Sequence, residues 1–398
     1  MGGEHGMRAR GAPPKNKNTA TFSKLRHRFT ASRDGIIRRI LPSQGSRPVA
    51  LALIGLALAS SVALQAQSPK PRVHIFATGG TISNVGGDDS KRRTGTQLLD
   101  AIPALKDVAD VTVEQFSNVA SGSITEEMWR KLAGRIYELS RGPNPPTGFV
   151  ITHGTDTMEE TAYFLDLTTS SCAPVVITGA MRQAAAVGAD GPANLLNAVR
   201  VAAAPASKGR GTVVLMNDEI FTARDVTKSN TTRLNAFTGV DVGPAGVTDP
   251  DGLIYYAPAP AGGCRPPLFD LDRIGPFPRV DVVYAYIGAD SVLVESLVSA
   301  GARGLVLAGV GRGGSTPSLG RALRRATDRG VFVAVSSRTG SGRTGGGSQT
   351  DSLETLPAGR GVALAAQNLN PQKARILLML ALAAKFDAMG IHELFRSR

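Results

Sequence analysis

Short apolar runs alternate with stretches of helical spacing through most of the chain, and this alternation constrains the possible folds more than any other feature. The runs are bounded by turn-forming residues, as strands are. A strand–helix alternation favours parallel sheets, because each helix returns the chain to the edge where the next parallel strand begins. We predict strands at 73–77, 149–152, 175–178 and 213–216, with helices at 126–139, 159–167 and 194–203.

The alternation is interrupted after Pro258 by a stretch rich in Pro and Gly, PAPAGGCRPP followed by GPFP. It then resumes with strands predicted at 280–286, 305–308 and 331–335, and helices at 292–300 and 318–328. A last helix begins at Asn370-Pro371, where Asn is a good N-cap and Pro suits the first helical position, and runs to about Ala384. The pattern predicts an α/β protein of two domains with largely parallel sheets: a larger N-terminal domain at 70–258, a linker at 259–279, and a smaller C-terminal domain at 280–398.

Most of the excess positive charge lies at the start of the chain. The sequence has 45 Lys and Arg against 32 Asp and Glu, a net charge of +13, and residues 1–66 contribute +9 of it. Residues 49–64 form an uncharged apolar run, with the small residues Ala63 at its end and Ala66 just after it. This arrangement is typical of a secretory signal peptide, here cut after Ala66, and the run is shorter than the roughly 20 residues that span a bilayer. We predict a periplasmic or secreted mature chain with no stable membrane anchor.

Several classes of site are excluded or disfavoured by the residues present. Two cysteines, Cys172 and Cys264, rule out a cysteine-rich metal site, and the three histidines after residue 66 lack metal-ligand spacing. GxxxxGK[ST] and GxSxG do not occur, and GxGxxG at 309–314 lacks the acidic partner of a dinucleotide site. The mature net charge of +4 is ordinary, so we expect no nucleic acid partner; salt-sensitive retention on DNA would show otherwise.

Three predicted strands end in the same kind of sequence: ATGGT at 77–81, THGTDT at 152–157 and TGAM at 178–181. Ligands bind beyond the carboxyl ends of parallel strands, so these ends should converge on one pocket for a small polar molecule. A threonine hydroxyl is a nucleophile only with a nearby base, and Lys228 is either that base or a solvated lysine. Each threonine alone is also explained as a strand or turn residue, and His153 as a core histidine.

These motifs resemble those of the bacterial-type L-asparaginases. The matching segments are ATGGTI at 77–82, VITHGTDTMEETAYFLDL at 150–167, VVITGAMR at 175–182, DGPANLLNAV at 190–199, VLMNDEIFTARDVTKSNTT at 214–232 and NPQKARILLMLAL at 370–382. The resemblance covers roughly residues 72–398. It implies a homotetramer built as a dimer of dimers, with sites between neighbouring subunits, which hydrolyses L-asparagine and, more slowly, L-glutamine, with no cofactor.

The resemblance also assigns the site residues. It implies catalytic roles for Thr81, Thr155, Asp156 and Lys228. It implies substrate binding by Gly80, Ser121, Gly122, Thr155, Asp156 and Ala180.

The chain departs from the family pattern at several positions. The family's active-site lid carries a tyrosine, and residues 82–98 contain none, so its role is either absent or filled by another residue such as Thr94 or an arginine. Gly288 stands near an expected asparagine, and Asp351 near an expected glutamate. Two alternatives therefore stay open: a glutaminase-asparaginase, and a catalytically weak amino-acid-binding homologue.

The cysteines depart from the pattern as well. Cys172 matches one half of a disulfide in some relatives, but the partner region near Ser140 has no cysteine. We expect Cys172 and Cys264 to be unpaired.

Overall fold

The computed structural model describes residues 69–86, 91–261, 263–345 and 361–397. The predicted leader at 1–66, including the apolar run at 49–64, lies outside the described residues. Within the described ranges, no helix combines the length and apolar character needed to cross a membrane.

The first sheet has eight strands in the order β10-β9-β6-β5-β4-β3-β1-β2. Five of them are parallel: β1 (Arg72–Gly79), β2 (Asp110–Val119), β3 (Gly148–Thr152), β4 (Val175–Thr178) and β5 (Thr212–Met216). Three antiparallel strands extend one edge: β6 (Glu219–Thr222), β9 (Gly246–Asp249) and β10 (Gly252–Tyr255). The parallel order 2-1-3-4-5 places the topological switch at β1, whose neighbours are β2 and β3.

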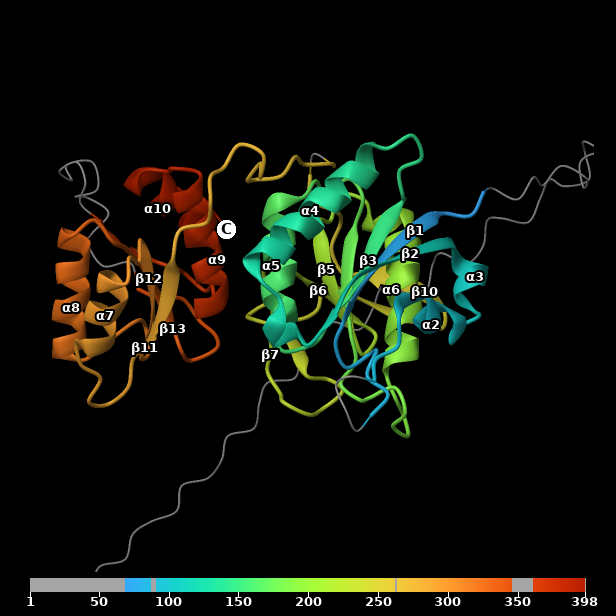
Figure 1. The fold of residues 1–398 in the computed structure, drawn as a ribbon, viewed down its shortest axis with the longest axis horizontal. Helices are drawn as coiled ribbons and strands as arrows, with labels where there is room; N and C mark the ends of the chain where they lie inside the picture. The colour runs from blue at the N-terminus through green and yellow to red at the C-terminus, as the bar shows by residue number, and fades with distance from the viewer. Residues whose placement is uncertain (1–68, 87–90, 262, 346–360, 398) are drawn as a thin grey trace, which may run out of the picture. The chain divides into compact units, whose positions relative to one another are not determined.

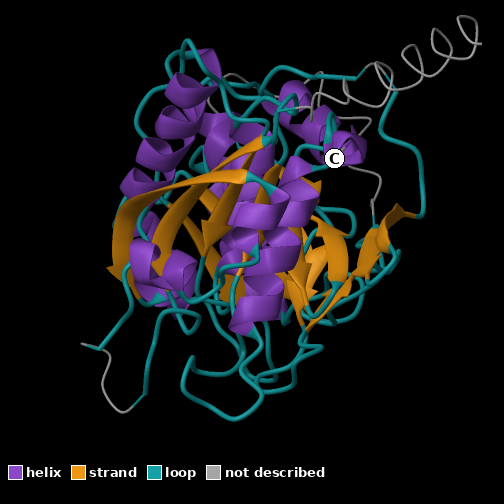
Figure 2. Ribbon diagram, turned by 90° about the vertical axis from the view of Figure 1, so that its right-hand side faces the viewer, coloured by secondary structure: helices purple, strands orange, loops and turns teal. Residues whose placement is uncertain are grey.

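Helices cover both faces of this sheet (Figures 1 and 2). On one face α4 (Glu126–Arg141) and α5 (Met158–Thr168) pack in a cluster with Phe76, Phe149 and Ile177. On the other α2 (Gly95–Asp100), α3 (Leu105–Val108) and α6 (Gly191–Ala203) pack in a cluster with Ile75 and Val150. Consecutive strand residues thus enter opposite cores, which explains why the central strands read as continuous apolar runs.

The second sheet has four parallel strands in the order β11-β12-β13-β14: β11 (Val280–Tyr284), β12 (Gly304–Gly309), β13 (Phe332–Ser337) and β14 (Ala363–Ala365). The helices α7 (Val292–Ser299) and α8 (Pro317–Asp328) cover one face, and α9 (Pro371–Ala383) and α10 (Ala388–Ser397) belong to the core on the other. The prediction of an α/β protein with a larger N-terminal and a smaller C-terminal part is confirmed.

Two short 3₁₀ helices, η2 (Ser121–Ser123) and η3 (Pro205–Ser207), and a separate hairpin of β7 (Val226–Lys228) and β8 (Phe237–Gly239) complete the elements. The sequence pattern predicts no strand at β2, β6 to β10 or β14. In β2 the side chains are mostly half-buried or exposed, so the apolar signal is weak. The others have three or four residues each, too short for a period to stand out.

The structure contradicts the prediction that the two cysteines are unpaired. Cys172 and Cys264 form a disulfide between the loop after α5 and the connection between the two sheets. The two segments are aligned by backbone hydrogen bonds: Ser171 N donates to the Arg265 carbonyl at 3.0 Å, and Arg265 N donates to Ser171 Oγ at 2.7 Å. The cysteines are 92 residues apart in sequence, and their Cα atoms are 4.5 Å apart in space. The connection is therefore attached to the first sheet's domain, which its composition did not indicate.

Candidate active site

The carboxyl ends of β1, β2 and β3 meet at the topological switch of the first sheet. Thr81 follows β1, Ser121 follows β2, and Thr155 follows β3. In the register of the sheet, Ala77 lies opposite Thr152, and Thr152 lies opposite Thr178. The three glycine- and hydroxyl-containing segments therefore begin side by side, at the point where open parallel sheets bind their ligands.

Glycines allow the turns after these strands to touch. A Cβ on Gly80 would lie 2.4 Å from Gly154 N, and a Cβ on Gly154 would lie 2.9 Å from Ser121 Oγ. Gly80 also has a φ of +82°, a conformation that favours glycine. The backbone of the Thr81 turn thus contacts the turn that carries Thr155, and this second turn contacts Ser121.

Lys228 forms hydrogen bonds with two of the predicted residues, Thr155 and Asp156, and these three residues make up the Lys228 group. Its Nζ lies 2.8 Å from Thr155 Oγ1 and 2.5 Å from Asp156 Oδ1. Thr155 is 6% exposed and the Lys228 side chain 14%, whereas the Asp156 side chain is 79% exposed. A buried hydroxyl is therefore joined through an amine to a carboxylate at the surface. Nζ donates both hydrogen bonds, and after it passes a proton to Asp156 the neutral amine can accept one from the hydroxyl or from a nearby water.

The other predicted residues lie in the turns after the neighbouring strands. Thr81 is half-buried in the turn after β1, where its carbonyl accepts a hydrogen bond from Asn84 N. Ser121 is buried at the start of η2, and its carbonyl accepts a hydrogen bond from Thr157 Oγ1 at 2.9 Å. Gly122 is exposed, with open space where a side chain would be.

Ala180 is fully buried in the loop after β4. The loop is held by the carboxylate of Asp190, which accepts hydrogen bonds from Met181 N and Arg182 N at 2.9 Å each. Asn194 Nδ2 donates to the Gly179 carbonyl at 3.0 Å. Asp190 and Asn194 lie in the DGPAN segment, whose pattern alone does not indicate that they shape the site.

His153 is a structural residue of the turn. It is buried, its Nδ1 lies 2.7 Å from the Gly154 carbonyl, and its Nε2 lies 2.9 Å from Thr161 Oγ1. Thr161 Oγ1 accepts a hydrogen bond from Trp129 Nε1. Burial lowers the pKa of His153 to about 4, against the opposing effect of the Gly154 hydrogen bond, so the imidazole is neutral at pH 7. Both ring nitrogens are satisfied.

Three positions stand out because the sequence departs from the family pattern there: Thr94, Gly288 and Asp351. Thr94 is the N-cap of α2, where its hydroxyl accepts from Gln97 N in a capping box. Gly288 lies in the exposed loop after β11 with a φ of +83°. Asp351 lies outside the described residues. Among the residues that the structure describes, no cluster of His, Cys, Asp and Glu is suited to hold a metal ion.

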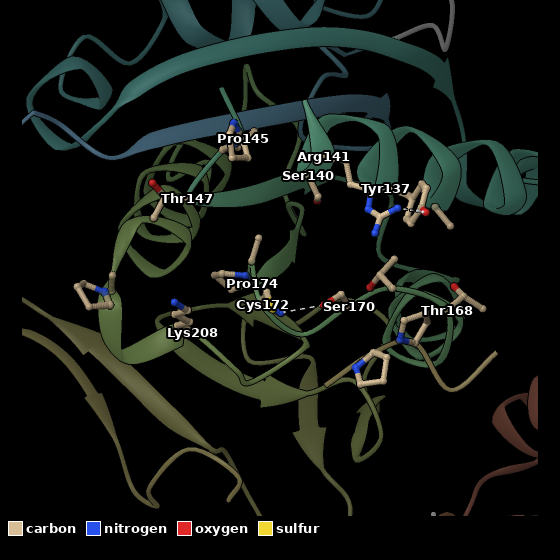
Figure 3. A pocket seen from close by; sticks show the side chains of 18 residues that line it. Tyr137, Ser140, Arg141, Pro145, Thr147, Thr168, Ser170, Cys172, Pro174 and Lys208 are labelled. Atoms are coloured by element: carbon tan, nitrogen blue, oxygen red, sulfur yellow. Dashed lines mark hydrogen bonds between the residues drawn. The ribbon is translucent and has the colours of Figure 1, made fainter. Parts of the chain in front are cut away.

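A cavity of about 520 Å³ opens over the Lys228 group, lined by Asp156, Glu159, Lys228, Ser229, Asn230, Thr231 and Gln372. A larger cavity of about 710 Å³ lies elsewhere, lined by Tyr137, Pro145, Thr147, Cys172, Pro174 and Lys208 among others (Figure 3). Pro174 and Thr147 precede β4 and β3, so the larger cavity is at the amino ends of the strands. Its lining contains none of the predicted site residues.

Comparison with known proteins places this geometry in a family. A family model described as "Asparaginase, N-terminal" matches residues 72–260, and one described as "Glutaminase/Asparaginase C-terminal domain" matches residues 279–395. L-asparaginase 2 of Escherichia coli is 43% identical over 82% of this chain and 92% of its own. The probable periplasmic L-asparaginase of Haemophilus influenzae is 40% identical over 82% of this chain and 92% of its own.

A solved structure agrees with the family models. The probable cytoplasmic L-asparaginase of Campylobacter jejuni is 36% identical, superposes with a TM-score of 0.76, and is similar over 82% of this chain and 99% of its own. Both sheets and the strand-end motifs fall within the matched ranges. The chain belongs to the bacterial-type L-asparaginase family.

Proposed function

We propose that this chain hydrolyses L-asparagine to L-aspartate and ammonia through a threonine nucleophile. The observation that carries the proposal is the hydrogen-bonded series Thr155 Oγ1, Lys228 Nζ and Asp156 Oδ1 at the switch point of the sheet. It supplies a proton relay that can deprotonate the attacking water, which hydrolysis of the threonine ester requires. The names of the relatives supply the substrate.

In the proposed mechanism, Thr81 Oγ attacks the side-chain amide carbon of asparagine. The carbonyl oxygen becomes an oxyanion, stabilised by backbone N–H groups of the Gly79-Gly80 and Gly154-Thr155 turns. The C–N bond breaks, and the hydroxyl proton leaves with the nitrogen as ammonia. A water molecule, deprotonated through Thr155, Lys228 and Asp156, then attacks the ester carbon, releases aspartate and returns a proton to Thr81.

The remaining residues bind the α-amino group, the α-carboxylate and the side-chain amide of the substrate. Asp156 binds the α-amino group through its exposed carboxylate. Ser121 and Gly122 hold the α-carboxylate, Gly80 lies beside the reacting carbon, and the Ala180 carbonyl accepts from the side-chain amide. Lys228 Nζ thus lies between the Asp156 carboxylate, which binds the substrate's amine, and the Thr155 hydroxyl.

The test of the reaction is ammonia release by the full chain from asparagine and from glutamine. We expect release from asparagine, and a slower release from glutamine would indicate a glutaminase-asparaginase. Aspartate binding with no ammonia from either amide would establish instead the weak amino-acid-binding homologue.

Substitution of either threonine tests the mechanism. Thr81→Ala and Thr155→Ala should each lower kcat by about a thousandfold or more, because catalytic groups that act as a unit fail together. The matched control is Thr327→Ala, in α8 of the C-terminal domain, which should keep wild-type kcat. Mass spectrometry of Thr155→Ala with asparagine should find an aspartyl ester on the peptide that contains Thr81. Wild-type turnover in either variant would overturn the role assigned to that threonine.

We propose an N-terminal domain at 70–258 and a C-terminal domain at 280–398, connected by residues 259–279.

We also propose a periplasmic or secreted mature chain, cut after Ala66. The basic, apolar and small-residue succession of the leader supports export. The Cys172–Cys264 disulfide adds support, because disulfides persist mainly in oxidising compartments. N-terminal sequencing of the chain from the periplasmic fraction would check both; an intact leader in the cytosol would refute export.

We propose a homotetramer arranged as a dimer of dimers. Large apolar side chains are exposed along β11 and just after it: Val282, Tyr284, Tyr286, Ile287, Val292 and Leu293. Ile287 is fully exposed, and β11 is an edge strand of its sheet. An apolar patch of this kind favours contact with another subunit. The high exposure of Asp156 also favours a neighbouring subunit that covers the site.

A further inference from the structure

The short strand β7 carries Lys228, and the main sheet does not hold it. Its strand partner is β8, and together they form a separate two-stranded sheet. Thr155, by contrast, directly follows the central strand β3. The 2.8 Å contact between Lys228 Nζ and Thr155 Oγ1 therefore depends on whatever fixes β7 relative to β3.

Glu159, in the first turn of α5, binds β7 from one side. It follows Thr155 by four residues, and its side chain is 6% exposed. Its Oε1 accepts hydrogen bonds from Thr227 Oγ1 at 3.1 Å and from Lys228 N at 3.3 Å. The carboxylate thus connects the helix after the catalytic turn to the backbone of Lys228 itself.

Lys373, in the first turn of α9, binds β7 from the C-terminal domain. It is 1% exposed, and its Nζ donates to the Arg224 carbonyl at 2.9 Å and to the Val226 carbonyl. The same Nζ lies 3.7 Å from Glu159 Oε2. The N-cap of α9, Asn370, donates from Nδ2 to Glu159 Oε2 at 2.7 Å.

Burial makes this arrangement costly unless every charge is compensated. An unpaired buried charge costs several kcal/mol, so a buried pair persists when its hydrogen bonds are satisfied. Burial lowers the pKa of Lys373 to about 8, although Glu159 and Asp225 oppose the shift, with Arg224 acting in the same direction as burial. An apolar pair would satisfy the packing between α5 and α9 at lower cost. The polar groups instead converge on the backbone of β7.

We propose that Glu159 and Lys373 are positioning residues for asparagine hydrolysis, whose buried ion pair holds β7 so that Lys228 Nζ contacts Thr155 Oγ1. The inference rests on the role proposed for Lys228 above. In this proposal α9, a helix of the C-terminal domain, helps to position Lys228, the proposed base in the N-terminal domain. A shift of about 1 Å in a reacting group costs on the order of a hundredfold in rate, so a modest displacement of β7 should be visible in kcat.

The first test is Lys373→Met in the full chain. We expect kcat for asparagine to fall by about 10- to 100-fold with KM changed by less than about threefold, because the base moves while the substrate-binding groups stay. Lys131→Met, an exposed lysine paired with Glu127 on α4, is the matched control and should keep wild-type kcat. Wild-type kcat in folded Lys373→Met would overturn the proposal.

A double-mutant cycle separates positioning from general stability. In a Lys228→Met background, Lys373→Met should lower the residual kcat by less than about twofold, because its effect passes through Lys228. Additive losses would overturn the proposal. Wild-type kcat in Lys228→Met alone would overturn the role of Lys228 as the base. An inactive Lys228→Met together with a fully active Lys373→Met would overturn only the positioning role.

A milder variant serves if Lys373→Met does not fold. Thr227→Val keeps the shape of the side chain and removes its hydrogen bond to Glu159. We expect a several-fold loss of kcat, about what one lost hydrogen bond of 1 kcal/mol gives, and recovery of wild-type kcat in Thr227→Ser. Equal losses in Thr227→Val and Thr227→Ser, or none in either, would overturn the proposal.

Discussion

His153 lies inside the turn that carries Thr155, and it is held there as a neutral imidazole. Its hydrogen bonds run from Trp129 through Thr161 to one ring nitrogen, and from the other ring nitrogen to the Gly154 carbonyl. Its folded pKa is about 4, below the ordinary 6.5. The histidine of this motif therefore shapes the turn that carries Thr155 and is not a cation at neutral pH.

This difference in pKa predicts a loss of stability in acid. Between pH 6.5 and pH 4 the unfolded chain binds a proton at His153 and the folded chain does not. The free energy of unfolding should therefore fall as the pH drops through this range, by about 3 kcal/mol at pH 4, and this contribution should be constant above pH 6.5. Urea unfolding of the wild type and of His153→Gln at pH 7.5, 5.5 and 4.5 measures it.

We expect the wild type to lose more stability than His153→Gln as the pH falls. His392→Gln, at a partly exposed histidine of α10, is the control and should follow the wild type. Equal losses in the wild type and His153→Gln would contradict the prediction.

Among the elements, the connection between the two sheets departs most from what its composition predicts. Its composition indicates a linker, yet Phe269 is buried, and Leu268, Leu271, Ile274 and Phe277 pack against the core. Arg130 of α4 donates to the carbonyls of Leu271 and Gly275 and stacks on Phe277. The connection is therefore part of the N-terminal domain's surface layer, and the disulfide fastens its beginning.

Removal of the disulfide should destabilise the chain without altering its chemistry. A bridge between residues 92 apart restricts the unfolded chain, so Cys172→Ser/Cys264→Ser should lower the free energy of unfolding by about 2–4 kcal/mol. The kcat for asparagine should stay at the wild-type value below the unfolding temperature, because both cysteines lie far from the Lys228 group in the fold.

Calorimetry with and without a thiol reductant provides the control. The reductant should lower the Tm of the wild type to that of the double variant and leave the variant unchanged. A reductant effect on the variant would mean that the shift has another origin, and an unchanged wild type would contradict the prediction.

At the scale of the whole molecule, the exposed apolar patch of β11 makes assembly testable. Light scattering should give a mass about four times that of one chain. Ile287→Asp places a charge in the centre of the patch and should yield smaller species. Activity should fall with the tetramer fraction, because the site is expected to lie between subunits.

Two variants serve as controls. Ile254→Asp places the same charge at an exposed residue of β10, and Leu99→Asp places it at a half-buried residue beside the core of the N-terminal domain. Ile254→Asp should remain tetrameric and active, and Leu99→Asp should lose stability without a specific change in assembly. Tetrameric, active Ile287→Asp would exclude this patch as the subunit contact.

Periodicity and capping in the sequence predict the longer strands and most of the longer helices, and the strand-end motifs predict the sheet edge of the proposed site. The predicted strands that fall in the described residues are present, Asn370 caps its helix, and the glycine- and threonine-containing segments come together. Periodicity, capping and parallel topology are local properties or follow from chain direction. The tertiary structure decided which distant side chains meet. Lys228 reaches Thr155 across 73 residues, Cys172 reaches Cys264 across 92, and Asn370 reaches Glu159 across 211. Such contacts depend on how whole helices pack, and a buried ion pair such as Glu159 and Lys373 leaves no periodic signal, since each partner reads alone as an exposed charge.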